Sequence, residues 1–122
     1  MSSVVDRDLA DARAAGVSDD RRFVIAYNAA LQAATIALRA EGYRTAGVAH
    51  HRTMISTLPM ILGPDTASTA DYLDACRSKR NTVDYEGIGI ATASDVLELI
   101  DEAERLRATV EAWLTEYHPD LR

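Results

Sequence analysis

The sequence has little of several residue types, and each shortage excludes a class of protein. A single cysteine, Cys76, excludes an intramolecular disulfide framework and any metal site built from several cysteines. Six glycines and three prolines in 122 residues exclude collagen-like and linker-like chains. No apolar run approaches about 18 residues, so we expect no membrane span. The first twenty residues are mixed in charge and lack a signal-peptide pattern, which favours a soluble cytoplasmic protein.

Alanine is the residue that the sequence has in excess, with 21 copies. Alanine has the highest intrinsic helix propensity, so its abundance favours a helical fold. The hydrophobic share of 48% is typical of a globular chain. A length of 122 residues suits one hydrophobic core, and we therefore expect residues 1–122 to form a single domain.

The net charge of −6 is distributed unevenly along the chain. Residues 1–62 carry seven arginines against six acidic residues, whereas residues 95–122 carry eight acidic residues against three arginines. An anionic chain is repelled by nucleic acid and by anionic membranes, so such a partner would need a local basic patch. The acidic excess itself indicates a solvated face of the last helix.

Start and stop signals divide the chain into five predicted helices. The first opens at a capping box of Ser3 and Asp6 and stops before Gly16, and the second is capped by Ser18 and ends at Gly42. The third begins near Thr45 and is kinked or terminated by Pro59, before a turn over residues 62–65. The fourth starts at a capping box of Ser68 and Asp71 and breaks at residues 86–89, and the fifth runs from a Thr92–Asp95 capping box to His118-Pro119.

Apolar residues recur at spacings of three and four within these segments, as they do on one face of a helix. In the second helix the stripe comprises Phe23, Tyr27, Ala30, Leu31, Ala34 and Leu38. Apolar residues off that stripe predict contacts on more than one side of this helix. The inner faces of the next two comprise Val48, His51, Ile55, Leu58 and Leu62, and then Tyr72, Leu73, Cys76, Arg80 and Val83. The seam of the last comprises Val96, Leu99, Ala103, Leu106, Val110, Trp113 and Tyr117.

No strand pattern competes with these helices, so we predict an all-α fold. Its architecture is an up-down bundle of four long helices plus a short N-terminal helix.

Histidines and the cysteine offer few sites for chemistry. His50 and His51 are adjacent and point about 100° apart on a helix, so they cannot share one metal ion. The chain has no H-E-x-x-H, E-x-x-H or phosphate-binding glycine motif, and we expect neither a metal nor a cofactor. The interpretation of His50 and His51 stays open between a partly buried polar residue and a general base or RNA contact. His118 suits the end of the last helix, and Cys76 is expected to be a buried structural thiol.

The densest basic cluster of this acidic chain comprises Arg77, Lys79 and Arg80. Arg80 falls on the apolar side of its helix, where an arginine needs a carboxylate, a phosphate or a neighbouring subunit. A simpler explanation is a ladder of Arg77 with Asn81 and of Arg80 with Asp84, at i,i+4 spacing. Spacing alone leaves both explanations open.

At this stretch the sequence resembles a HEPN domain, a small helical bundle of prokaryotic toxin–antitoxin, phage-defence and RNA-processing systems. The overall plan is similar over most of the chain, with a penultimate helix that ends in the signature and a long final helix. The family's motif is an arginine, a polar residue, three variable residues and a histidine. Arg80 matches the arginine and Asn81 the polar residue, but Tyr85 stands where the family has histidine.

The resemblance implies a homodimer in which two motifs face each other and form a ribonuclease site without a metal ion. Arg80 would hold the scissile phosphate, whereas Tyr85 is a poor proton carrier because an ordinary tyrosine pKa is about 10. On one continuous helix, Arg80 and Tyr85 would lie about 140° apart. They would therefore meet more easily across a dimer than within one chain.

Three functional hypotheses follow. The favoured one is a HEPN-like module of a toxin–antitoxin or defence system with weak or no ribonuclease activity. It would act as a homodimer, through an antitoxin or nucleotidyltransferase partner and through RNA bound by Arg77, Lys79 and Arg80. The first alternative is an active, metal-independent ribonuclease toxin that uses Arg80, Asn81 and Tyr85. The second is an unrelated helical scaffold or ligand sensor with a pocket near Tyr27 and Trp113.

Overall fold

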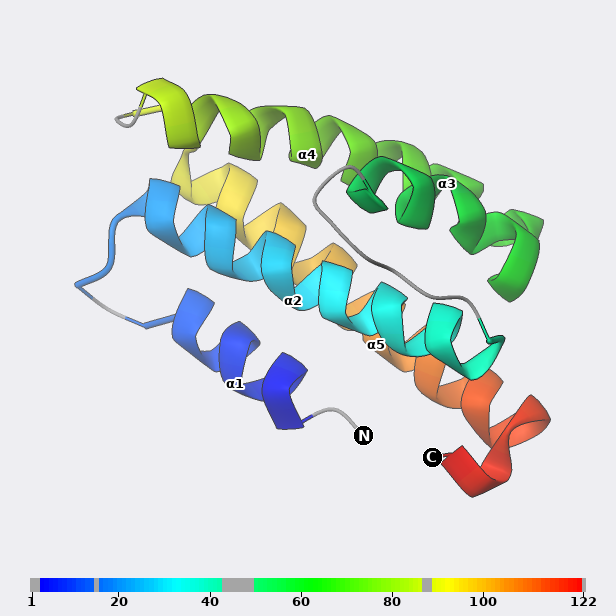
Figure 1. Cartoon of the computed structure of the whole chain (residues 1–122). Helices are drawn as coiled ribbons and strands as arrows, with labels where there is room; N and C mark the ends of the chain where they lie inside the picture. The colour runs from blue at the N-terminus through cyan, green and yellow to red at the C-terminus, as the bar shows by residue number, and fades with distance from the viewer. Residues whose placement is uncertain (1–2, 15, 43–49, 87–88, 122) are drawn as a thin grey trace.

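A computed structural model describes residues 3–14, 16–42, 50–86 and 89–121, and these residues form five α-helices (Figure 1). The helices are α1 (Ser3–Ala12), α2 (Asp19–Ala40), α3 (His50–Leu62), α4 (Ala67–Glu86) and α5 (Ala93–Tyr117). Short 3₁₀ turns follow α3 (Pro64–Thr66) and α5 (Pro119–Leu121). No strand occurs in the described ranges, and the predicted all-α bundle with a short N-terminal helix is confirmed. The predicted start of the third helix near Thr45 lies outside the described residues.

The central element is α2, which packs against all four other helices. Its buried residues are Phe23, Ala26, Tyr27, Ala29, Ala30, Leu31, Ala33, Ala34, Ala37 and Leu38. This set is wider than one stripe and confirms the expected contacts on more than one side. Six of its members are alanines, whose small side chains let neighbouring helices approach closely.

The same helix is long and apolar enough, by length and composition alone, to cross a membrane. It is the one such helix among the described residues, and 56% of its most apolar window is buried inside the protein. The core helix of a globular bundle meets the same criteria, and the position of α2 between the other helices is that of a core helix.

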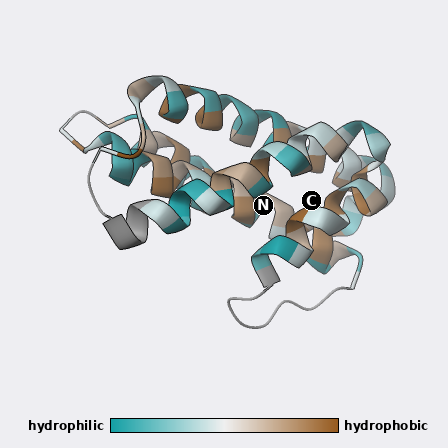
Figure 2. Cartoon of the chain, turned by 90° about the horizontal axis from the view of Figure 1, so that it is seen from above, coloured by the Kyte–Doolittle hydropathy of each residue, from teal (hydrophilic) through white to brown (hydrophobic). Residues whose placement is uncertain are grey.

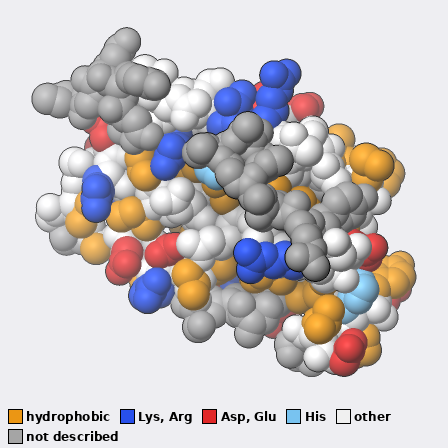
Figure 3. All heavy atoms as spheres, viewed as in Figure 1, with side chains coloured by type: hydrophobic (Ala, Val, Ile, Leu, Met, Phe, Trp, Pro, Cys, Tyr) orange, Lys and Arg blue, Asp and Glu red, His pale blue; other side chains and the backbone are white. Residues whose placement is uncertain are grey.

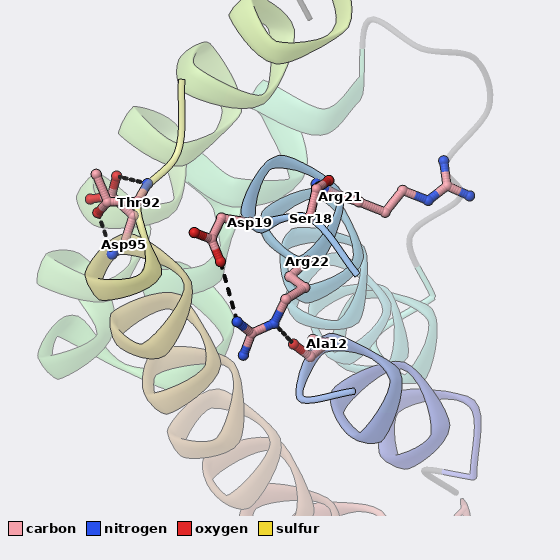
Figure 4. Close-up of polar contacts among 7 residues, drawn as sticks. All are labelled: Ala12, Ser18, Asp19, Arg21, Arg22, Thr92 and Asp95. Carbon is pink, nitrogen blue, oxygen red and sulfur yellow. Dashed lines mark hydrogen bonds and ion pairs between the residues drawn. The ribbon is translucent and has the colours of Figure 1, made fainter. Parts of the chain in front are cut away.

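The corner between α1 and α2 is held by polar contacts (Figure 4). Ser18 caps α2 by accepting a hydrogen bond from the backbone N–H of Arg21 at 3.2 Å, as predicted. Arg22 donates to the backbone carbonyl of Ala12 at 2.6 Å and pairs with Asp19 at 3.3 Å. One guanidinium therefore satisfies a carbonyl at the end of α1 and fixes it against the start of α2.

The long helix α5 lies along α2 and supplies much of the core. It begins at the predicted capping box, in which the Thr92 side chain and the Asp95 side chain each accept from the other residue's backbone N–H. Its buried residues are Val96, Leu99, Ile100, Ala103, Leu106, Val110 and Leu114. The predicted seam is wrong in its last turn. Trp113 is only half-buried and Tyr117 is 62% exposed, because the core follows Leu114 instead.

The hairpin of α3 and α4 covers α2 on the side away from α1 (Figure 1). Hydrophobic and hydrophilic residues alternate along the helices (Figure 2). Met54, Ile55 and Leu58 of α3 are buried. Pro59 lies inside α3, which continues for three more residues, so it does not terminate the helix. The predicted capping box at Ser68 is wrong: α4 begins at Ala67, directly after the 3₁₀ turn, and Ser68 is an exposed residue of its first turn.

A carboxylate from α2 fixes the segment that leads from α4 to α5. Asp20 accepts hydrogen bonds from the backbone N–H groups of Gly89 (2.7 Å), Ile90 (3.0 Å) and Ala91 (2.8 Å). The bond from Ala91, with those from Gly89 and Ile90, lowers the pKa of Asp20 against the opposing effect of burial. These three bonds hold residues 89–91 against the start of α2, directly before the cap of α5, and no local pattern in the sequence predicts them.

Candidate functional site

The second half of α4 has no buried residue among its described side chains. The buried residues of this helix are Ala70, Leu73 and Cys76, all in its first half. From Arg77 to Thr82 every residue is half-buried or exposed. This half contains the basic cluster of Arg77, Lys79 and Arg80, and all three side chains are half-buried.

Arg77 and Arg80 lie one helical turn apart and act on the same two neighbours. Both cations interact electrostatically with Tyr27 of α2 and with His51 of α3. Arg77 also bonds through Nε to Asp74 Oδ1 at 3.1 Å, one turn earlier. The predicted ladder pairing of Arg77 with Asn81 is therefore wrong, and the pairing of Arg80 with Asp84 lies outside the described side chains.

Lys79 points to a different part of the molecule. Its Nζ lies 2.6 Å from Asp95 Oδ2 at the start of α5 and 5.9 Å from the centre of the Phe23 ring. The hydrogen bond from Lys79 is the largest of the causes that lower the pKa of Asp95. Lys79 thus ties α4 to the cap of α5, and the structure separates it from the two arginines with which the sequence grouped it.

Tyr27 is completely buried, yet its hydroxyl has no hydrogen-bond partner among the described residues. Burial raises the pKa of Tyr27 to about 12, with a smaller opposing effect from Arg77 and Arg80. A buried hydroxyl without a partner is unfavourable, because folding has removed it from water without a replacement.

His51 stands beside Tyr27, with ring centres 6.3 Å apart and planes tilted by 56°. Burial, followed by the charges of Arg80 and Arg77, lowers the pKa of His51. The imidazole is therefore neutral at neutral pH and can both donate and accept a hydrogen bond. Of the two open interpretations of this residue, the partly buried one is confirmed, and a functional role stays a prediction.

The remaining motif positions are only partly described. Asn81 is exposed on α4, while the side chains of Tyr85 and His50 lie outside the described residues. The helical backbone of α4 continues to Glu86, so positions 80 and 85 lie about 140° apart around its axis. Within one chain the helix therefore directs Arg80 and position 85 to different sides.

Cys76 is not part of the candidate site. It is 5% exposed, and burial is the main cause that raises the pKa of its thiol to about 11. Tyr72 lies one turn before Cys76, and both side chains interact electrostatically with Glu98, which places this pair on the α5 side of the helix. A protonated, covered thiol is unreactive, in agreement with the predicted structural role.

Elsewhere on the described surface, charges of both signs are mixed. On the face seen in Figure 3, Lys and Arg side chains lie in separate places among acidic and hydrophobic ones. Among the described residues there is no group of three or more His, Cys, Asp or Glu that could hold a metal ion. The described cavities are lined by neither Tyr27 nor Trp113, so the pocket expected near these two residues is not among them.

Sequence reasoning missed one residue of this arrangement. Tyr27 counted only as a member of the apolar stripe of α2, and nothing in its spacing distinguishes a hydroxyl that finds a partner from one that does not. Its signal was chemical: it is the one residue of that stripe with a polar tip.

The molecule is an all-α bundle with an Arg-Asn pair, Arg80-Asn81, on the outer half of its penultimate helix. A family model described as SAV_6107-like HEPN matches residues 12–111, well over half of the chain. The chain therefore belongs to the HEPN superfamily, and the predicted resemblance is confirmed. No curated protein and no solved structure matches it significantly.

Proposed function

We propose that this HEPN domain serves a prokaryotic toxin–antitoxin or defence-type system as a binding module with weak or no ribonuclease activity. It acts as a homodimer and binds an antitoxin or nucleotidyltransferase partner and RNA. The observation that carries the proposal is the state of α4. Arg77 and Arg80 are half-buried cations on its outer half, but the position of the motif histidine holds Tyr85.

RNA binding by this module is supported by the two arginines that lie close together on α4. Arg77 and Arg80 lie one turn apart on the same side of α4, in a chain of net charge −6. Guanidinium groups bind phosphate through paired hydrogen bonds. Lys79 is engaged with Asp95, so we assign it a smaller share of RNA binding than either arginine.

The experiment combines RNA binding, RNA cleavage and the state of association. We expect wild type to bind single-stranded RNA, and Arg80→Gln to weaken that binding about tenfold or more. The matched control is Arg105→Gln, which removes an exposed cation that pairs with Glu102 on α5. This control should weaken binding much less.

Cleavage of labelled RNA in the presence of a chelator decides between the binding module and the alternative ribonuclease. Rapid cleavage that is lost in Arg80→Ala would establish the enzyme and overturn the proposal. Sedimentation over a wide concentration range should detect a dimer, and a strict monomer would contradict that part. Equal RNA affinity in wild type and Arg80→Gln would contradict the RNA contact.

A further inference from the structure

Two neighbouring hollows lie on the surface of the bundle beside the C-terminal half of α2. The first is a cavity of about 310 Å³ between α1 and α2, and the second is a cavity of about 340 Å³ between α2 and the end of α5. Both are lined by Ile36 and Arg39, so the two hollows adjoin. None of their lining residues belongs to α3 or α4, so they are separate from the basic cluster of α4.

The second hollow is lined by four apolar side chains and one cation. The apolar residues are Ile36 and Ala40 of α2, Leu114 of α5 and Leu121 of the 3₁₀ turn after α5, and the cation is Arg39. Small-molecule sites in proteins are mostly apolar with a few polar groups, and their volumes begin at about 300 Å³. Leu121 is 53% exposed, so an apolar ligand in the hollow would remove apolar surface from water.

Arg39 is exposed, and no described residue forms an ion pair with it. The acidic residue nearest to it in the sequence, Glu41, is bonded to His118 at 3.0 Å, where α2 and α5 end side by side (Figure 1). A cation in the last turn of α2 interacts favourably with the helix dipole. That interaction explains a positive charge at this place but not the apolar hollow next to it. The guanidinium group is therefore available to bind an anion at the edge of the hollow.

We propose that the second hollow binds a single-chain organic carboxylate, with its anionic head on Arg39 and its chain against the four apolar side chains. A guanidinium group binds a carboxylate through two parallel hydrogen bonds, whereas it repels an organic cation. The first hollow suits the anionic head less well. Asp8 of α1 accepts a hydrogen bond from its lining residue Gln32 and brings a negative charge there.

The ligand is a free molecule and not a membrane surface. The chain has a net charge of −6, so an anionic membrane repels it as a whole. A small carboxylate meets only the local charge, which at the second hollow is that of Arg39.

Three probes test whether the site selects an anion. Decanoate, decanol and decyltrimethylammonium share one chain and differ in the charge of the head. An NMR titration of the whole chain, below the concentration at which each probe forms micelles, measures affinity, and shift changes at Ile36 and Leu114 locate the site. Decanoate should bind about tenfold more tightly than decanol, because Arg39 adds charge-assisted hydrogen bonds. Decyltrimethylammonium should bind least tightly.

Substitutions separate the head of the ligand from its chain. Arg39→Gln should weaken decanoate binding about tenfold and leave decanol binding unchanged. The matched control is Arg21→Gln, which removes an exposed arginine at the other end of α2 and should change neither affinity.

Two variants alter the apolar wall. Leu121→Ser, at an exposed position, should weaken binding of decanoate and of decanol several-fold. Ala40→Trp should abolish both, because the larger side chain would fill the hollow. The melting temperature of each variant shows whether it folds.

Several outcomes would overturn the proposal. Equal affinity of wild type for decanoate and decanol, or no binding of either, would mean that Arg39 selects no anion there. Decanoate affinity unchanged in both Leu121→Ser and Ala40→Trp would place the ligand elsewhere. Binding to phosphatidylglycerol vesicles but not to free decanoate would identify a membrane contact. Shift changes at Ile36 and Leu114 that follow the protein concentration instead of the ligand would identify a contact between two copies of the chain.

This inference goes beyond the proposed function and does not depend on it. Arg39→Gln should bind RNA as wild type does, and Arg80→Gln should bind decanoate as wild type does. Failure of wild type to bind RNA would leave the carboxylate site intact. Loss of decanoate binding in Arg80→Gln would contradict the separation of the two sites.

Discussion

Helices α4 and α5 follow one another in the chain but differ in how far burial extends along them. Along α5, buried residues recur from Val96 to Leu114, over nearly its whole length. Along α4, burial stops at Cys76, and the following turns expose or half-expose every described side chain. One helix is a core element throughout, whereas the other is a core element for its first half only.

This difference separates stability from function within one small bundle. The free energy of folding depends on the α2–α5 contact and on the inner half of α4, where apolar area leaves water. The outer half of α4 contributes little burial, so substitutions there should change the free energy of folding less. It keeps its place because Asp20 and Lys79 attach the adjoining segment and α5 to the rest of the fold.

The largest expected difference compares the two helices directly. Leu99→Ala in α5 removes a completely buried side chain and should lower the free energy of unfolding by about 2–5 kcal/mol. Arg77→Gln in α4 removes a partly exposed pair with Asp74 and should change it by about 0.5 kcal/mol or less. Urea denaturation of both variants measures the contrast.

Leu97→Ala is the control for this comparison, because Leu97 lies on the same helix but is 59% exposed. Its effect should stay within about 0.5 kcal/mol. A loss in Arg77→Gln as large as that in Leu99→Ala would show that the outer half of α4 is part of the core, and the contrast between the helices would fail.

The next effect concerns the joint between the two helices. Asp20→Asn exchanges a carboxylate that accepts three backbone hydrogen bonds for an amide, whose NH₂ group would face N–H groups. We expect a clear loss of stability at neutral pH. Asp19→Asn is the matched control, because Asp19 makes only a surface pair with Arg22, and it should have a smaller effect.

The pH dependence of this loss has a definite sign. The folded pKa of Asp20 is lowered from its ordinary value of 3.8, so its contribution to stability is complete above that value. The contribution disappears as the pH falls through the lower, folded pKa. The difference between wild type and Asp20→Asn should therefore shrink below about pH 4, and a constant difference down to acid pH would contradict the assignment.

The sequence predicts the repeating features of this fold and fails at its single contacts. The stripe on α2 and the Thr92 cap follow from local spacing, so both could be predicted. The end of the α5 seam could not, because the choice between Trp113 and Leu114 depends on which neighbours α5 meets there. Lys79 and Asp95 are sixteen residues apart, and nothing in the local sequence around either residue predicts that they pair.

The same distinction between local spacing and helix packing applies to the candidate site. Arg80 and Asn81 could be found because they belong to a short motif with fixed spacing. The convergence of Tyr27 and His51 on the two arginines could not, since it depends on how three helices pack. Spacing did predict that Arg80 and Tyr85 diverge on a continuous helix, and the helix is indeed continuous to Glu86.

The smallest expected effect compares the two helix starts, where the same sequence signal gave one correct and one wrong prediction. Thr92→Ala removes the hydroxyl that caps α5 and should lower the free energy of unfolding by about 1 kcal/mol. Ser68→Ala should cause no loss, because Ser68 lies inside the first turn of α4 and alanine has the higher helix propensity. Denaturation of both variants under the same conditions tests this, and equal losses would mean that Ser68 caps α4 after all. The expected inequality has a physical cause: the 3₁₀ turn at residues 64–66 leads directly into α4, so this helix needs no side-chain cap where α5 does.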